Sequence, residues 1–97
     1  MAAGLGATSV PAVANGLTVS MGCYPGVNGP GTFRCEAVAS QQFVSYFWFG
    51  SQNATILRPK HGRIINGQCT PGLVSEVTVG VTTPQEEASA TDTFTCL

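Results

Sequence analysis

Apolar residues recur at every second position in short runs from Asn15 onward, and this pattern constrains the fold of the chain most strongly. In the clearest run, 73–82, valine at positions 77, 79 and 81 alternates with threonine and glycine. Because neighbouring side chains of a strand point to opposite faces, such a run buries one face and exposes the other. No stretch of eleven residues without Gly or Pro shows the i, i+3, i+4, i+7 apolar spacing of a helix. The sequence therefore predicts an all-β fold.

Clusters of Gly, Pro, Asn and Ser separate the apolar runs, as is typical of turns between strands. The predicted strands are 17–23, 33–39, 43–49, 54–57, 64–65, 73–82 and 88–97. Asn66-Gly67 is predicted to be a turn. Short strands at this spacing favour a β-sandwich. The sequence shows neither an internal repeat nor a second domain, so residues 15–97 are interpreted as one domain.

Four cysteines supply the covalent cross-links that a domain of 97 residues often needs, since a small domain buries a modest fraction of its surface. They are Cys23, Cys35, Cys69 and Cys96. Their spacing contains no C-x-x-C pair and the chain has one histidine, so no metal site is expected. Two disulfides formed in an oxidising compartment are the favoured interpretation.

Hairpin geometry favours sequential pairing of these cysteines. A hairpin centred on residue 29 places Cys23 directly opposite Cys35. A second hairpin, centred near residue 85, brings Cys96 to within a short stretch of Cys69. The alternative pairs Cys35 with Cys69 and Cys23 with Cys96, which would bridge the two sheets. Each disulfide is expected to contribute about 3 kcal/mol to stability.

The first fourteen residues carry an export signal in part. Residues 1–14 are small and apolar and end in Ala12-Val13-Ala14, an A-x-A pattern that suits signal peptidase. A positively charged n-region is missing, because the first base of the chain is Arg34. We interpret residues 1–14 as a signal-peptide remnant or as a flexible N-terminal arm, and we expect a secreted, extracellular protein.

Charge is scarce, and this argues against two classes of partner. Only 9% of the residues are charged, five acids and four bases, against about 25% in an ordinary soluble protein. A net charge of −1 leaves no electrostatic footprint for nucleic acid or an acidic membrane. No run approaches the roughly 18 apolar residues of a spanning helix, so no membrane span is expected.

The predicted strand 43–49 is apolar on both faces. If Tyr46 and Trp48 enter the core, the phenylalanines of the other face line the outer side of the sheet. Threonines of neighbouring strands would lie beside them, and Gly80 would leave space where a ligand could approach. The candidate binding face comprises Phe43, Phe47, Phe49, Thr78, Gly80 and Thr93. Alternatively, this face forms a dimer interface or is covered by the N-terminal arm.

Three of the four bases and the only histidine fall in the segment 58–63. This candidate basic loop comprises Arg58, Lys60, His61 and Arg63. Clustered bases on a charge-poor surface create a local positive patch that suits an anion or an acidic partner. A loop stiffened by proline also suits presentation to a protease. The simpler alternative is an exposed loop that carries solubilising charges.

We expect no enzyme and assign no catalytic or cofactor-binding residue. A nucleophile needs a base within reach, and the only histidine lies in a turn rich in Pro and Gly. Nothing in the sequence positions Asp92 and a serine beside it. Glu86 and Glu87 are adjacent in a hairpin loop, where neighbouring side chains point apart. Asn53-Ala54-Thr55 is a glycosylation sequon that has meaning only in a eukaryotic secretory path.

Two motifs together resemble the polycystic-kidney-disease-type (PKD) domain. They are Tyr46-Phe-Trp-Phe-Gly50 and, about twenty residues later, Pro71-Gly-Leu-Val-Ser-Glu-Val-Thr-Val-Gly-Val-Thr82, followed by a Ser/Ala/Thr-rich final strand. The family shows Tyr-x-Trp-x-Phe-Gly-Asp-Gly and then Pro-Gly-x-Tyr-x-Val-x-Leu-x-Val-x-Asn. Ser51-Gln52 replaces the family's Asp-Gly, so the role of that Asp is not carried over.

The resemblance covers residues 17–96 in outline and implies an immunoglobulin-like antiparallel β-sandwich of about seven strands, here stabilised by disulfides. Such domains occur in secreted and surface proteins, usually as binding or spacer modules. The four cysteines lie outside the family's usual pattern, which indicates a secreted bacterial variant.

We therefore expect a secreted, non-catalytic module that recognises a glycan or a protein through the candidate binding face. One alternative is a small inhibitor of an extracellular hydrolase that acts through residues 58–63. A second alternative is a structural spacer. The module is expected to be a monomer, or a dimer formed through a sheet face.

Overall fold

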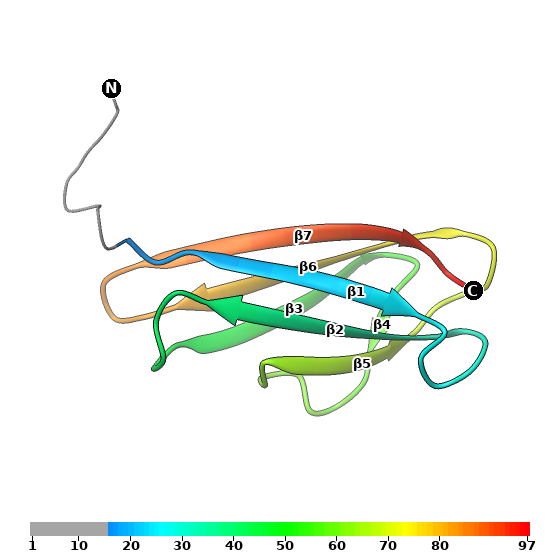
Figure 1. Ribbon diagram of the computed structural model, residues 1–97, viewed down its shortest axis with the longest axis horizontal. Coiled ribbons are helices and arrows are strands. Elements are labelled where there is room, and N and C mark those ends of the chain that lie inside the picture. The colour runs from blue at the N-terminus through cyan, green and yellow to red at the C-terminus, as the bar shows by residue number, and fades with distance from the viewer. Residues whose placement is uncertain (1–15) are drawn as a thin grey trace, which may run out of the picture.

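A computed structural model describes residues 16–97 as two antiparallel β-sheets packed face to face (Figure 1). Residues 1–14, interpreted as a signal remnant or arm, lie outside the described residues. The strands are β1 (Val19–Pro25), β2 (Thr32–Ala39), β3 (Ser45–Gln52), β4 (Thr55–Ile56), β5 (Ile64–Gln68), β6 (Val74–Thr82) and β7 (Glu87–Thr95). Residues 16–97 form no helix that could cross a membrane.

The order of the strands is that of an immunoglobulin constant-type domain. One sheet has the order β1-β2-β5-β4 and the other β3-β6-β7, which correspond to strands A-B-E-D and C-F-G. The predicted all-β, immunoglobulin-like sandwich of seven strands with disulfides is thereby confirmed. In Figure 1, β1 and β2 cross in front of β3 and β6.

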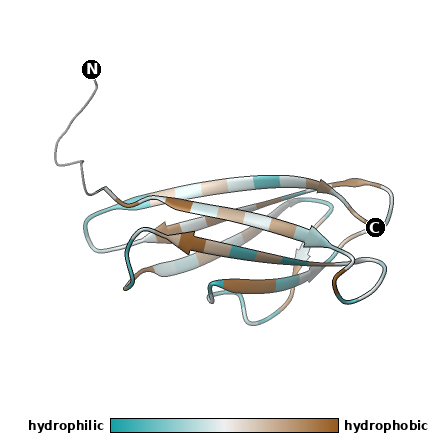
Figure 2. Cartoon of the chain, in the orientation of Figure 1, coloured by the Kyte–Doolittle hydropathy of each residue, from teal (hydrophilic) through white to brown (hydrophobic). Residues whose placement is uncertain are grey.

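The core lies between the sheets and follows the alternation seen in the sequence. Val77 and Val79 of β6 are fully buried, and Phe33 and Ile65 reach them from the opposite sheet. Phe33 also packs against Phe94 of β7, with 5.2 Å between the ring centroids. Figure 2 shows the alternation as bands of differing hydropathy along the strands. Burial of each large apolar side chain stabilises the fold by about 1.5–3 kcal/mol.

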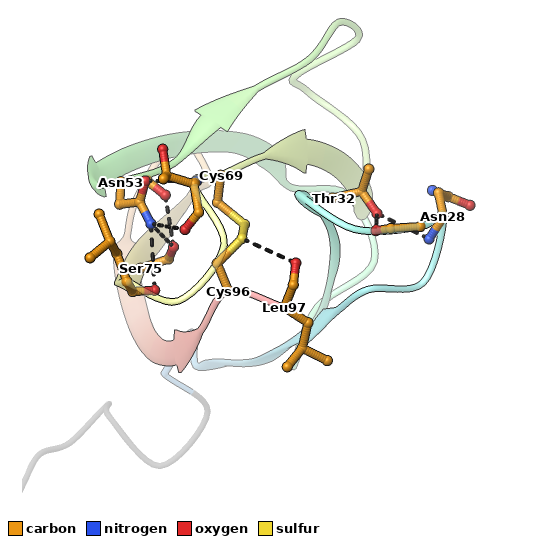
Figure 3. Close-up of a disulfide and its surroundings, with 10 residues drawn as sticks. Asn28, Thr32, Asn53, Cys69, Ser75, Cys96 and Leu97 are labelled. Atoms are coloured by element: carbon orange, nitrogen blue, oxygen red, sulfur yellow. Dashed lines mark hydrogen bonds between the residues drawn. A yellow bond between two sulfur atoms is a disulfide. The ribbon is translucent and has the colours of Figure 1, made fainter.

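Both disulfides pair cysteines in sequential order. Cys23 and Cys35 lie directly opposite each other in the β1–β2 pair and are bonded. Cys69 follows β5 and Cys96 follows β7, and their bond ties the two sheets together at one end of the sandwich (Figure 3). These are the pairs that the two hairpin centres predict.

Two local predictions were wrong. Asn66-Gly67, predicted as a turn, lies inside β5, where Gly67 pairs with Phe33 of β2. A Cβ atom at Gly67 would overlap the ring of Phe33, so this glycine leaves room for the core ring rather than for a turn. The third strand begins at Ser45 instead of residue 43, and Phe43 therefore precedes the strand.

Strands β1 and β7 lie side by side at one edge of the sandwich and run in the same direction (Figure 1). Cys23 and Cys35 form a non-hydrogen-bonded pair of the antiparallel ladder, with their Cα atoms close together. The backbone N–H of Cys23 is therefore directed away from β2. The Oδ2 atom of Asp92 on β7 accepts a hydrogen bond from this N–H at 2.9 Å. Asp92 thus supplies a hydrogen-bond acceptor for the free edge of β1.

We predict that Gly67→Ala lowers the free energy of unfolding by about 1–3 kcal/mol, because the added methyl group overpacks the Phe33 ring. Urea unfolding measures the change as a shift of the midpoint at constant m-value. Gly62→Ala is the matched control, since its Cβ would make only ordinary contacts at 3.6 Å and beyond. Equal urea midpoints for the two variants would contradict the conclusion that Gly67 is needed to leave room for the Phe33 ring.

Candidate functional site

The alternation of side chains along β3 produces one buried and one exposed aromatic face. Trp48 is 5% exposed and packs in the core, with Tyr46 beside it on the same face. Phe47 and Phe49 point outward and are 42% and 58% exposed. The outer face of the β3-β6-β7 sheet therefore carries two phenylalanine rings two residues apart on one strand.

A hollow lies beside these rings because of the register of the sheet. Phe47 pairs with Gly80 of β6, and Gly80 pairs with Ser89 of β7, so the position next to the ring has no side chain. The hollow has a volume of about 360 Å³. It is lined by Phe47, Phe49, Gly80, Val81, Thr82, Glu87, Ala88 and Ser89.

Hydroxyl groups continue this face toward the far end of β7. Thr78 and Thr91 are hydrogen-bonded through their Oγ1 atoms at 2.8 Å. Thr93 is exposed farther along β7. Threonine and serine hydroxyls both donate and accept hydrogen bonds, so the face offers polar groups without net charge.

The structure brings together part of the face expected from the sequence. Phe47, Phe49 and Gly80 line one hollow, and Thr78 lies opposite Phe49 in the register. Phe43 is 90% exposed but lies before β3, outside the sheet. The remaining lining residues, such as Ser89, could have been found by extending the hairpin register centred near residue 85.

The candidate basic loop lies between β4 and β5. Arg58, Pro59, Lys60 and His61 line a second hollow of about 650 Å³. Arg63 does not line it, and its backbone oxygen accepts a hydrogen bond from the N–H of Ala37 in β2. Arg58 and Lys60 therefore line the same hollow, whereas Arg63 is not among its lining residues.

Three contacts hold this loop against β3. The indole Nε1 of Trp48 donates a hydrogen bond to the oxygen of Gly62 at 2.8 Å. The ring of His61 donates from Nδ1 to the oxygen of Tyr46 at 3.2 Å, which places its proton on Nδ1 because a carbonyl only accepts. The same ring meets Phe47 edge-on, with 5.9 Å between centroids.

The contact between His61 and Phe47 joins two surfaces that the sequence presents as separate. Phe47 lines the hollow of the sheet face, and His61 lines the hollow of the loop. A lining residue of one hollow therefore contacts a lining residue of the other. The sequence gives no signal for this contact, because residue 47 belongs to a strand pattern and residue 61 to a separate loop.

The two adjacent glutamates have different surroundings. Glu86 accepts hydrogen bonds from the backbone N–H of Leu17 at 3.3 Å and from the side chain of Gln41 at 3.1 Å. Glu87 begins β7 and lines the hollow of the sheet face. Only Glu87 therefore adds a carboxylate to that hollow.

The side chain of Asn53, the first residue of the sequon, is part of the fold. Its Nδ2 atom donates to the oxygen of Thr70 at 3.1 Å and to Oγ of Ser75 at 3.0 Å, and its Oδ1 accepts from the N–H of Thr70 at 2.9 Å (Figure 3). The backbone of Asn53 has a φ of 45°, a conformation that asparagine tolerates better than most residues. Asn53 thus fixes the turn before β4 to the segment that leads into β6.

Within residues 16–97, no three His, Cys, Asp or Glu side chains gather in a way that could hold a metal ion. Comparison of the chain with protein-family models, with curated proteins and with solved structures gave no match. The fold and the geometry of the two hollows therefore carry the functional argument.

We predict that Asn53→Asp lowers the free energy of unfolding by about 2 kcal/mol. The substitution keeps the shape and the oxygen that accepts from Thr70, but it places an oxygen against acceptors that Nδ2 satisfied. Thermal or urea unfolding measures the loss. Asn28→Asp is the control, because Asn28 is exposed and donates one long bond to Asn66 at 3.3 Å. A loss no larger than that of the control would show that the network around Asn53 does not stabilise the fold.

Proposed function

We propose that this protein is a non-catalytic binding module whose site is the outer face of the β3-β6-β7 sheet. The observation that carries the proposal is the pair of exposed rings, Phe47 and Phe49, beside the hollow over Gly80. Exposed aromatic rings grouped on one sheet face leave apolar surface in contact with water. A ligand that covers this surface binds favourably, because apolar area is removed from water. The partner is a glycan or a protein.

Secretion is part of the proposal. Two intramolecular disulfides are consistent with an oxidising, extracellular environment. The A-x-A pattern at Ala12–Ala14 supports passage through an export pathway. Trp48 in the core of β3 and Pro71-Gly72 before β6 support a PKD-type relationship, in a bacterial variant with added disulfides.

A second function, inhibition of an extracellular hydrolase through residues 58–63, is favoured by one observation. Hydrogen bonds from Trp48 and His61 hold this loop to β3, so the loop is preorganised. A preorganised loop loses less conformational entropy when it binds an enzyme. A structural spacer remains if neither surface binds.

The sheet face is tested with Phe49→Ser, since Phe49 lines the hollow whereas Phe47 also contacts His61 of the loop. We expect this variant to bind about tenfold more weakly or worse, because it removes an aromatic ring that the bound ligand would cover. Binding is measured on a glycan array and by affinity capture from culture medium followed by titration of the captured partner. Val38→Ser is the matched control, because Val38 is 62% exposed on the opposite sheet.

Two further measurements separate the alternatives. Arg58→Ala combined with Lys60→Ala is expected to abolish hydrolase inhibition if the basic loop is the binding surface. Sedimentation of the purified protein with and without Phe49→Ser shows whether the face pairs two copies. If neither the Phe49 variant nor the loop variant changes binding, both binding functions are wrong and a structural spacer is the function that remains.

A further inference from the structure

The candidate face is bordered by opposite charges. The basic loop lies along β3, where His61 contacts Phe47, and Glu87 lies on β7 at the far side of the three-stranded sheet. Two strand spacings separate β3 from β7, which is about 10 Å. A ligand on this face therefore has a positive border at one side and a carboxylate at the other.

The surface between these borders is amphipathic. Two phenylalanine rings form its apolar part, and the hydroxyl groups of Thr82 and Ser89 lie in the same hollow. A sugar ring has matching chemistry, since its C–H face stacks on an aromatic ring while its hydroxyls bond to side-chain oxygens. Glu87 adds a strong acceptor for those hydroxyls.

The size of the apolar part favours a sugar over a protein. A specific protein interface buries about 800 Å² on each partner around an apolar centre. Here the exposed apolar surface at the hollow consists of the rings of Phe47 and Phe49, and the hollow of about 360 Å³ suits a small group. One or two sugar units match this space.

The basic loop indicates that the ligand carries a negative charge. Arg58 and Lys60 are exposed and line the hollow that adjoins Phe47 through His61. These two bases are half of the four bases of the chain, so the positive charge is concentrated at this border. A carboxylate or sulfate on the ligand would be attracted there, whereas it would be repelled at Glu87.

We propose that the face binds an acidic glycan, with a sugar ring stacked on Phe47 and Phe49 and its anionic group at Arg58 and Lys60. The inference rests on the proposed function and specifies its ligand. The opposite borders fix the orientation, with the anionic group toward β3 and the hydroxyl edge toward Glu87. The two surfaces that the sequence presents as rivals then form one site.

The test compares acidic glycans with neutral counterparts of the same linkage. An array carries uronic-acid oligosaccharides beside their carboxyl-reduced forms and sulfated oligosaccharides beside their desulfated forms, so that its two arms distinguish carboxylate from sulfate. The full chain is applied, and pairs that bind are titrated by calorimetry at two salt concentrations. We expect the acidic member to bind about tenfold more tightly or better, with an advantage that shrinks at high salt.

Variants then assign the two parts of the site. Lys60→Gln is expected to weaken the acidic ligand and to leave the neutral one unchanged, whereas Phe49→Leu weakens both. Arg63→Gln is the charge-matched control, because Arg63 is in the same loop but does not line the hollow. All three side chains are exposed, and circular dichroism verifies that each variant is folded.

Each other outcome overturns the inference in a recognisable way. Equal binding of acidic and neutral members would leave a glycan-binding module without the anionic contact. Acidic binding that Phe49→Leu does not change would show attraction to the loop alone. If no oligosaccharide binds but Phe49→Ser still abolishes capture of a protein partner, the proposed binding function stands and the glycan is wrong. If Phe49→Ser has no effect either, both proposals fail.

Discussion

The indole of Trp48 makes the contact on which both the core and the surface depend. Its ring fills the space between the two sheets, and a buried indole N–H needs an acceptor because an unpaired polar group in a core costs about 1–3 kcal/mol. The oxygen of Gly62 provides that acceptor at 2.8 Å. Satisfying the core donor therefore draws the loop 58–63 onto β3, which sets His61 beside Phe47. The position of the basic loop beside the sheet face is thus linked to a requirement of the core.

Much of the fold follows from local sequence patterns, and the failures have local causes. The two-residue period predicts which face of β3 is buried, since Trp48 enters the core and Phe47 points outward. The hairpin centres predict both disulfides because antiparallel register is set by the turn. Asn66-Gly67 has the composition of a turn, yet it lies inside a strand, where Gly67 leaves space for the ring of Phe33 on the neighbouring strand. A pattern along the chain does not contain that tertiary contact.

The candidate site was predictable only in its separate parts. Composition and alternation find the phenylalanines and the cluster of bases, because each belongs to one continuous segment. Their meeting at the Phe47–His61 contact depends on how a loop of one sheet folds onto an edge of the other. The structural role of Asn53 is hidden for the same reason, since its partners Thr70 and Ser75 lie far along the chain.

The sandwich protects its strand edges with side chains and loops. Asp92 binds the backbone of β1, contacts from the loop 58–63 cover part of β3, and β4 is only two residues long. Exposed edges otherwise pair with other chains and lead to aggregation. A protein with few charges has little repulsion to prevent this, so these devices compensate for its charge-poor surface.

The placement of the disulfides determines how the domain responds to mechanical force. The start of β1 and the C-terminus lie at opposite ends of the sandwich (Figure 1), so tension between Leu17, just before β1, and Leu97 acts along the strands and loads the adjacent β1 and β7 in shear. The covalent path between these two residues crosses from Cys23 to Cys35 and from Cys69 to Cys96. Residues 24–34 and 70–95 are therefore shielded from extension even when every strand has separated. Under load the unfolded domain is a shortened, cross-linked tether, and its maximum length is set by the residues outside the two disulfide loops rather than by the whole chain.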